Sequence, residues 1–404
     1  MQRLILFALI FGTLSSGASA QMLPIFGPKV YTQGNGPIEV VADTFQNCES
    51  AAQYELVVAN GNADGSARVS SASVFLNGAQ VFGPKDINRG VASATKRITV
   101  STSNKLETML GPSTGGSITT SVQCVSGCLS VQITSPAWTS ALNVSAVNVG
   151  GTVSSSADEV GVTVNGMLAA VVNGQFQAPV VPLVLGANTL TATATNACLN
   201  QAKATGQVEA SALSVLPITL TAAPTSGLAP LTVAFTANVS SVNTITSYAW
   251  DFNGDGVIES SGAGLSQVSS TYTQAGLYLA TVTATDSKGN QFEGQVPIQV
   301  DSSAELGALL QKRWSSLTGA LKSQSTNAAL GLFDPSATQK YQTVFSELAA
   351  QLPQIVSSFG NVGLYSEFNG VAELITVRTQ SGSEFVYFIY LEQDQNGLWK
   401  FMSM

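Results

Sequence analysis

Four oxygen-bearing side chains are spaced closely enough along the chain to hold a metal ion. They are Asp251, Asn253, Asp255 and Glu259, at positions one, three, five and nine of a calcium-binding loop, and Gly256 occupies the sharp turn at position six. Calcium prefers hard oxygen ligands on a flexible loop. The spacing therefore predicts a structural calcium site.

The same residues also have a simpler interpretation. Position twelve, where a calcium loop carries a bidentate carboxylate, is Gly262, and the loop is expected between strands rather than helices. Asp286 is not expected to supply the missing carboxylate, because it falls in a later loop at the opposite pole of the sandwich. The alternative is an ordinary polar turn whose Asn and Asp oxygens accept hydrogen bonds from their own backbone.

Four cysteines, Cys48, Cys124, Cys128 and Cys198, allow three disulfide pairings. In an immunoglobulin-like strand order the first and last strands of a module end at the same pole, which favours Cys48 with Cys124 and Cys128 with Cys198. The competing pairing joins Cys124 to Cys128 in a local loop. A site of four thiolates on one metal would need all four on one face, and is the weaker interpretation.

Composition limits the chemistry open to the chain. Only 10% of its 404 residues are charged, the net charge is −8, and no histidine is present. The acidic balance without a basic cluster argues against nucleic acid and anionic membranes as partners. The lack of histidine removes Ser-His-Asp and Cys-His catalysis and the usual zinc sites. We therefore expect no enzyme activity.

Residues 1–20 are typical of a secretory signal peptide. A positive start at Arg3 is followed by an apolar run from Leu4 to Leu14, and Ala18 and Ala20 place cleavage before Gln21. The alternative is a membrane anchor, but the apolar run is shorter than the ~20 residues that span a bilayer. We expect a secreted or cell-surface protein, with the periplasm as another exported location and no transmembrane segment after cleavage.

Residues 21–125 and 126–212 each predict an immunoglobulin-like β-sandwich. Short strands alternate with turns, and the pairs Asn165–Gly166 and Asn173–Gly174 indicate tight hairpins. The run Val74–Val81 also repeats in pattern at Val162–Ala169. With its opening run Ile133–Ala137 and a closing strand over 186–197, the second segment resembles the glucodextranase-type immunoglobulin-like module, which implies a spacer or binding arm.

Residues 213–301 resemble a PKD (polycystic kidney disease) module along its whole length. The resemblance rests on Ser247–Phe252 with the following Asn-Gly-Asp-Gly loop, on the opening Pro224–Val233, and on the closing stretch Ala275–Asp286. It implies an immunoglobulin-like sandwich common in secreted bacterial proteins. Side chains alternate along a strand, so Trp250 is expected in the core.

Residues 302–404 change to helical spacing and then back to a period of two. Ser302 and Glu305 form a capping box, Asp334 precedes a second amphipathic helix, and strands follow from 362 onward. This order resembles the nuclear-transport-factor-like cone. Residues 385–391 are apolar at every position, which predicts a strand with helices on one face and a second apolar surface on the other.

A pocket between helices and sheet would be the place for specific chemistry in this segment. Its candidate lining is Tyr365, Tyr387 and Tyr390 with the carboxylates Glu367 and Glu373. Two such acids at a suitable separation could cleave a glycoside. The alternative is that the aromatic side chains are core and the carboxylates are solvated.

The sequence as a whole predicts a multidomain, mainly β protein: tandem immunoglobulin-like sandwiches, including a PKD module, followed by a C-terminal α+β domain. We expect a secreted, non-catalytic protein whose sandwiches act as a spacer for a C-terminal domain that binds an extracellular protein or glycan in adhesion or structural presentation. No cofactor is expected besides the calcium considered above. The alternatives are an extracellular enzyme with an acid and tyrosine site in residues 302–404, and a subunit of a surface fibre, which would self-associate.

Overall fold

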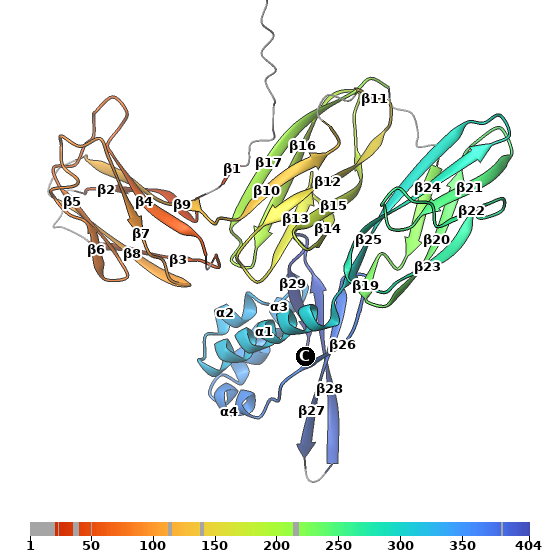
Figure 1. The fold of residues 1–404 in the computed structure, drawn as a ribbon. Coiled ribbons are helices and arrows are strands. Elements are labelled where there is room, and N and C mark those ends of the chain that lie inside the picture. The colour runs from red at the N-terminus through yellow and green to blue at the C-terminus, as the bar shows by residue number, and fades with distance from the viewer. Residues whose placement is uncertain are drawn as a thin grey trace, which may run out of the picture.

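The computed structural model describes residues 21–22, 24–34, 40–49, 51–111, 115–137, 141–212, 218–380 and 383–404. The expected signal peptide, 1–20, lies outside these residues. The described chain is a mainly β, multidomain protein whose helices are confined to the C-terminal region, as the sequence predicts (Figure 1). Its buried residues form separate apolar clusters, one for each of the three sandwich modules and one for the C-terminal region.

The first module packs two four-stranded sheets face to face. Their orders are β2–β9–β4–β7 and β3–β8–β5–β6. Along β4 buried and more exposed side chains alternate, so Leu56 and Val58 face the core. The strands are β2 (Phe26–Thr32), β3 (Val40–Gln46), β4 (Gln53–Asn60), β5 (Ala72–Leu76), β6 (Ala79–Phe82), β7 (Ser93–Ile98), β8 (Ser103–Leu110) and β9 (Ser117–Ser126).

The second module has strands in the order β1–β17–β16–β13–β14–β15–β12–β10, with β11 also on β17. Asn165 and Asn173 have positive φ angles, 50° and 51°, and each precedes a glycine at a hairpin turn, as predicted. The strands are β1 (Gln21–Met22), β10 (Ser130–Ser135), β11 (Ala141–Leu142), β12 (Ala146–Ser154), β13 (Val160–Val164), β14 (Met167–Val172), β15 (Gln175–Pro182), β16 (Gly186–Asn196) and β17 (Gln201–Ala210).

The third module is built around Trp250, which is fully buried as predicted. Its ring centroid lies 5.7 Å from that of Phe235 and 5.6 Å from that of Phe252, and its Nε1 donates to the Leu265 carbonyl at 2.9 Å. The strands are β18 (Ile218–Ala223), β19 (Ser226–Leu228), β20 (Leu231–Val239), β21 (Ile245–Asp251), β22 (Ser260–Gly262), β23 (Gln267–Tyr272), β24 (Gly276–Asp286) and β25 (Gln291–Asp301).

In the C-terminal region, helices cover one face of an antiparallel sheet. The Ser302 hydroxyl accepts from the Glu305 amide, and the Asp334 carboxylate from the Ser336 amide, so both predicted caps form. The elements are α1 (Ser303–Lys322), α2 (Thr326–Leu330), α3 (Pro335–Glu347), α4 (Leu352–Ser357), β26 (Gly363–Phe368), β27 (Val371–Gln380), β28 (Ser383–Gln393) and β29 (Trp399–Ser403).

The short strand β19 connects the third module to the C-terminal region. It pairs in parallel with β25 and, at Gly227 and Phe368, in antiparallel with β26. One nine-stranded sheet therefore runs through both parts (Figure 1). Among the described residues, no helix has the length and apolar character needed to cross a membrane.

Candidate functional site

The predicted calcium loop brings three of its carboxylates together. One oxygen from each of Asp251, Asp255 and Glu259 lies within 4.8 Å of the other two. Asp251 also accepts hydrogen bonds from the amides of Gly254, at 2.6 Å, and Gly256, at 2.8 Å. The cluster has the oxygen donors that calcium requires, and its conformation is also fixed by its own backbone.

The remaining loop contacts support the polar-turn interpretation as well. Asn253 accepts from the Asp255 amide at 2.8 Å, and Glu259 accepts from the Phe252 amide at 2.8 Å. Asp286 pairs with Ile245 at the far end of β21 from Asp251, so it cannot complete the calcium shell, as predicted. There it accepts from Asn290 and Asn243, and these hydrogen bonds hold the pKa of Asp286 well below its usual range.

The predicted disulfide pairing is wrong, and the competing local loop is correct. Cys48 is bonded to Cys198, with 5.7 Å between their Cα atoms, and Cys124 is bonded to Cys128. Cys48 follows β3, whereas Cys124 lies in β9, which belongs to the opposite sheet of the first module. The prediction failed because it assumed that each long-range disulfide lies within one module, whereas the Cys48–Cys198 bond joins two modules.

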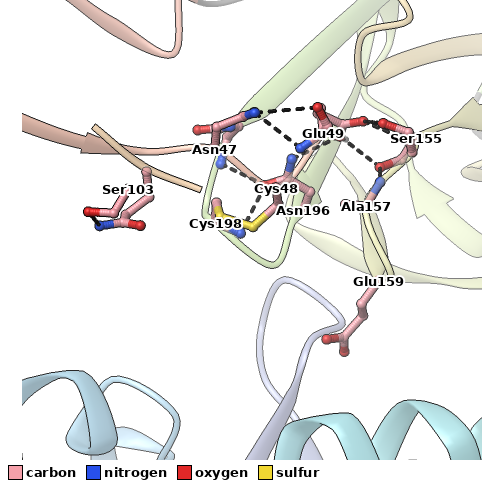
Figure 2. The surroundings of a disulfide bond; sticks show 12 residues. Asn47, Cys48, Glu49, Ser103, Ser155, Ala157, Glu159, Asn196 and Cys198 are labelled. Atoms are coloured by element: carbon pink, nitrogen blue, oxygen red, sulfur yellow. Dashed lines mark hydrogen bonds between the residues drawn. A yellow bond between two sulfur atoms is a disulfide. The ribbon is translucent and has the colours of Figure 1, made fainter. Parts of the chain in front are cut away.

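A buried carboxylate reinforces this joint between the first two modules (Figure 2). Glu49 is only 3% exposed and accepts from the Ser155 hydroxyl at 2.7 Å, the Ser156 amide at 2.6 Å and the Asn196 side-chain amide at 2.9 Å. Charge-assisted bonds of this kind are stronger than neutral ones. Together with the adjacent disulfide, they fix the first module against the second. Nothing in the local sequence around Glu49 indicated this role.

A second joint connects the second module to the C-terminal region through an ion pair. Glu159 and Arg313 form this pair, and both side chains are almost fully buried. The other oxygen of Glu159 accepts from the Trp399 amide at 2.6 Å, and Lys312 pairs with Asp158 nearby at 2.6 Å. Burial lowers the pKa of Arg313, while the carboxylates around it act in the opposite direction.

A third joint lies where β19 meets β26. Glu367 is 6% exposed, and its Oε1 accepts from the Ser226 hydroxyl at 3.0 Å and the Gly370 amide at 2.9 Å. Its Oε2 is buried and has no hydrogen-bond partner in the described chain. Burial raises the pKa of Glu367 to about 7, and Asp301 adds to the rise.

A cavity of about 800 Å³ lies where the first module, the second module and α1 meet. Polar and apolar groups line it in similar measure. Residues from the three parts include Tyr54 and Arg97, Asp158 and Glu159, and Leu309 and Lys312. Its charged side chains are largely paired with one another at the second joint, so the cavity follows from the way the modules are joined.

The residues predicted to line a C-terminal pocket do not form one, although Glu373 and Tyr390 do come together. Glu367 lies opposite the buried Ala372, on the face of the sheet that the helices cover. Glu373 is the next residue along β27, so it lies on the other face, where it accepts from the Tyr390 hydroxyl at 2.9 Å. Tyr365 and Tyr387, at 65% and 41% exposure, are open to solvent. The two carboxylates cannot act on one substrate.

The sheet face opposite the helices is apolar and exposed, as the run 385–391 predicts. We call it the outer face. Within it Val377 pairs across strands with Val386, and Ile375 pairs with Phe388. Ile375 is half-buried, and the other members range from 38% exposure for Tyr390 to 56% for Phe368, which is high for side chains of this kind. The outer face comprises Phe368, Val371, Ile375, Val377, Val386, Phe388 and Tyr390.

Comparison with known proteins identifies one part of the chain. Residues 217–293 match the PKD domain family, so this protein contains a PKD domain within a multidomain, β-rich chain. The first PKD domain of the Vibrio cholerae metalloprotease PrtV is similar at 34% identity, over 21% of this chain and 93% of that one, with a TM-score of 0.17. No match is found among curated proteins.

Two larger structures are similar over more of the chain. Dimeric latent PorU from Porphyromonas gingivalis is 11% identical over 71% of this chain and 34% of its own, with a TM-score of 0.25. The SGBP-B protein of a Bacteroides ovatus mixed-linkage glucan utilization locus, in complex with a heptasaccharide, is 14% identical over 70% of each chain, with a TM-score of 0.17. At such scores neither structure defines the arrangement of the whole chain.

Proposed function

We propose that this is an exported, non-catalytic protein in which three joined sandwich modules hold out a C-terminal binding domain. The observation that carries the proposal is the outer face, a solvent-exposed apolar surface on a sheet whose other face packs against helices. Large exposed apolar surfaces on soluble proteins mark sites of interaction. The disulfide and the buried carboxylates of the three joints support a fixed presentation of this face.

Export is supported by the PKD domain and by both disulfides. Disulfides form and persist in oxidising compartments, and PKD domains are typical of extracellular proteins. The signal peptide expected over 1–20 agrees with this location. Within this proposal the second module remains a glucodextranase-type candidate, and residues 302–404 remain a candidate cone of the nuclear-transport-factor kind.

The absence of catalysis is supported by residue chemistry. The chain has no histidine, and Glu367 and Glu373 lie on opposite faces of one sheet. The space between sheet and helices is packed with buried rings such as Trp314, Phe345 and Phe401. An enzyme with an acid and tyrosine site is therefore the weaker alternative.

The chemistry of the outer face favours a protein as its partner. Valine, isoleucine and phenylalanine predominate, and a surface of this composition gains stability by excluding water against another apolar surface. A glycan would need polar side chains placed around an aromatic platform to bind its hydroxyl groups. On the outer face, the Glu373 carboxylate already bonds to Tyr390 and Ser366.

The test is binding of the labelled, full mature chain to the producing cells and to their secreted protein. A double variant, Val386→Ser with Phe388→Ser, should bind at least about tenfold more weakly, because it removes two large apolar contacts. The control is Val184→Ser with Leu185→Ser, a similarly apolar pair that is 65% exposed at each residue but lies in the second module. Equal binding by wild type and the outer-face variant would overturn the proposal.

A further inference from the structure

We propose that the outer face packs against the outer face of a second copy of this chain, forming a two-fold symmetric dimer. This inference rests on the proposed function, because it names the partner of the same surface. A two-fold interface uses one surface patch on both subunits, so that patch must be complementary to itself. The exposed apolar area, the placement of charges and the strand geometry of the outer face are each compatible with such a self-complementary patch.

The apolar area matches what a stable dimer needs. An aromatic side chain buries ~150–250 Å² when fully covered, and Phe368, Phe388 and Tyr390 are 56%, 48% and 38% exposed. With the half-exposed Val371, Val377 and Val386, the outer face offers about 500 Å² of apolar surface. A standard interface buries about 800 Å² per partner, of which a little over half is apolar.

The carboxylate near the centre of the outer face, Glu373, is hydrogen-bonded within its own chain. Glu373 accepts from the Tyr390 hydroxyl at 2.9 Å and from the Ser366 hydroxyl at 3.3 Å, so its carboxylate is satisfied within its own chain. The acidic residues Glu384 and Glu392 lie at the two ends of β28, toward the rim. Two copies of a chain with a net charge of −8 can meet at this centre, while the rim carboxylates repel.

The geometry of the sheet also suits packing against an identical sheet. Two sheets pack face to face about 10 Å apart with strands roughly aligned, because both have the same twist. The cross-strand pairs Val377–Val386 and Ile375–Phe388 form adjacent apolar rows for such packing. The β27–β28 hairpin extends past α4 in Figure 1, and on its outer face Val377, Val386 and Phe388 are 50%, 52% and 48% exposed, so they are open to a partner.

The test is sedimentation of the full mature chain over about a hundredfold range of concentration. Wild type should dimerise, and Val386→Ser with Phe388→Ser should weaken association at least about tenfold. Val386→Lys, which puts a charged group into this apolar surface, should also weaken it, whereas Val184→Ser with Leu185→Ser should not. Added salt should strengthen the dimer by screening the rim carboxylates, whereas a partner of complementary charge would bind less tightly in salt.

Three results would contradict the inference, and they separate it from the proposed function. A wild-type chain that stays monomeric, while the outer-face variant loses cell binding, overturns the dimer and leaves the proposed function standing. A dimer that persists unchanged in both outer-face variants places the interface elsewhere. A monomer whose cell binding is unaffected by the variants overturns both. Unchanged thermal unfolding of each variant shows that loss of association does not come from loss of the fold.

Discussion

At the scale of single residues, buried carboxylates join neighbouring modules through hydrogen bonds. Glu49, Glu159 and Glu367 are each at most 7% exposed, and each accepts hydrogen bonds from another module. Glu159 is paired with the guanidinium group of Arg313, and Glu49 has several polar partners. Glu367 differs because its Oε2 has no hydrogen-bond partner among the described residues and because the nearby charged group is another carboxyl, Asp301.

Because of this difference, we predict that the free energy of unfolding depends on pH through the protonation of Glu367 at the third joint. The folded chain holds the proton of Glu367 up to about pH 7, whereas an unfolded glutamate releases it near 4.5. The stabilisation is therefore fully present below about pH 4.5 and is lost as pH rises to about 7, by up to about 3 kcal/mol. Thermal unfolding of wild type between pH 5 and 8 should show this loss.

The variant Glu367→Gln should remove that dependence, because its neutral amide cannot ionise. The matched control Glu305→Gln changes an exposed acid at the start of α1 and should keep the wild-type profile. If Glu367→Gln and wild type lose stability in parallel from pH 5 to 8, Glu367 is not the group responsible.

Residue-level prediction from the sequence succeeded where the cause is local. Trp250 follows from strand alternation, the caps at Ser302 and Asp334 from hydrogen-bonding chemistry, and the Asn165–Gly166 turn from its need for positive φ. The partners of Glu49 lie more than a hundred residues away in the chain. No local pattern encodes such a contact.

At the scale of elements, the sequence indicated which strands have two apolar faces but not how strands from different modules meet. The run 385–391 predicted the outer face because its apolar residues occupy both phases of the strand alternation. The three-residue strand β19 has no comparable signal, yet it connects the third module to the C-terminal sheet. Pairing between distant short strands depends on the assembled modules.

The loop after β21 is the element whose ligand is most directly testable. Asp251, Asp255 and Glu259 place three carboxylates within reach of one ion, and extracellular modules typically bind calcium at about 0.1–1 mM. We predict that millimolar calcium raises the unfolding temperature of the full chain above that measured with a chelator, by mass action. Asp255→Asn should abolish the rise, and Asp86→Asn, in the first module, should preserve it. Equal unfolding temperatures with calcium and chelator would favour the polar turn.

At the scale of the whole molecule, the joints turn a string of modules into one connected body. The Cys48–Cys198 bond closes a separation of 150 residues, against 4 for Cys124–Cys128. On the chain-entropy model these loops stabilise by about 5 and 2 kcal/mol. The overall class, mainly β and modular, could be predicted from composition and turn spacing. The arrangement of modules could not, because it depends on contacts between them.

Small-angle X-ray scattering tests this account most directly. The oxidised mature chain, carrying Val386→Ser and Phe388→Ser to keep it monomeric, should give a curve that one fixed arrangement of modules describes. Adding Cys48→Ser and Cys198→Ser should increase the radius of gyration, because the first module loses its covalent joint to the second. A curve from the oxidised chain that already requires many module orientations would contradict the claim that the joined modules hold out the C-terminal domain.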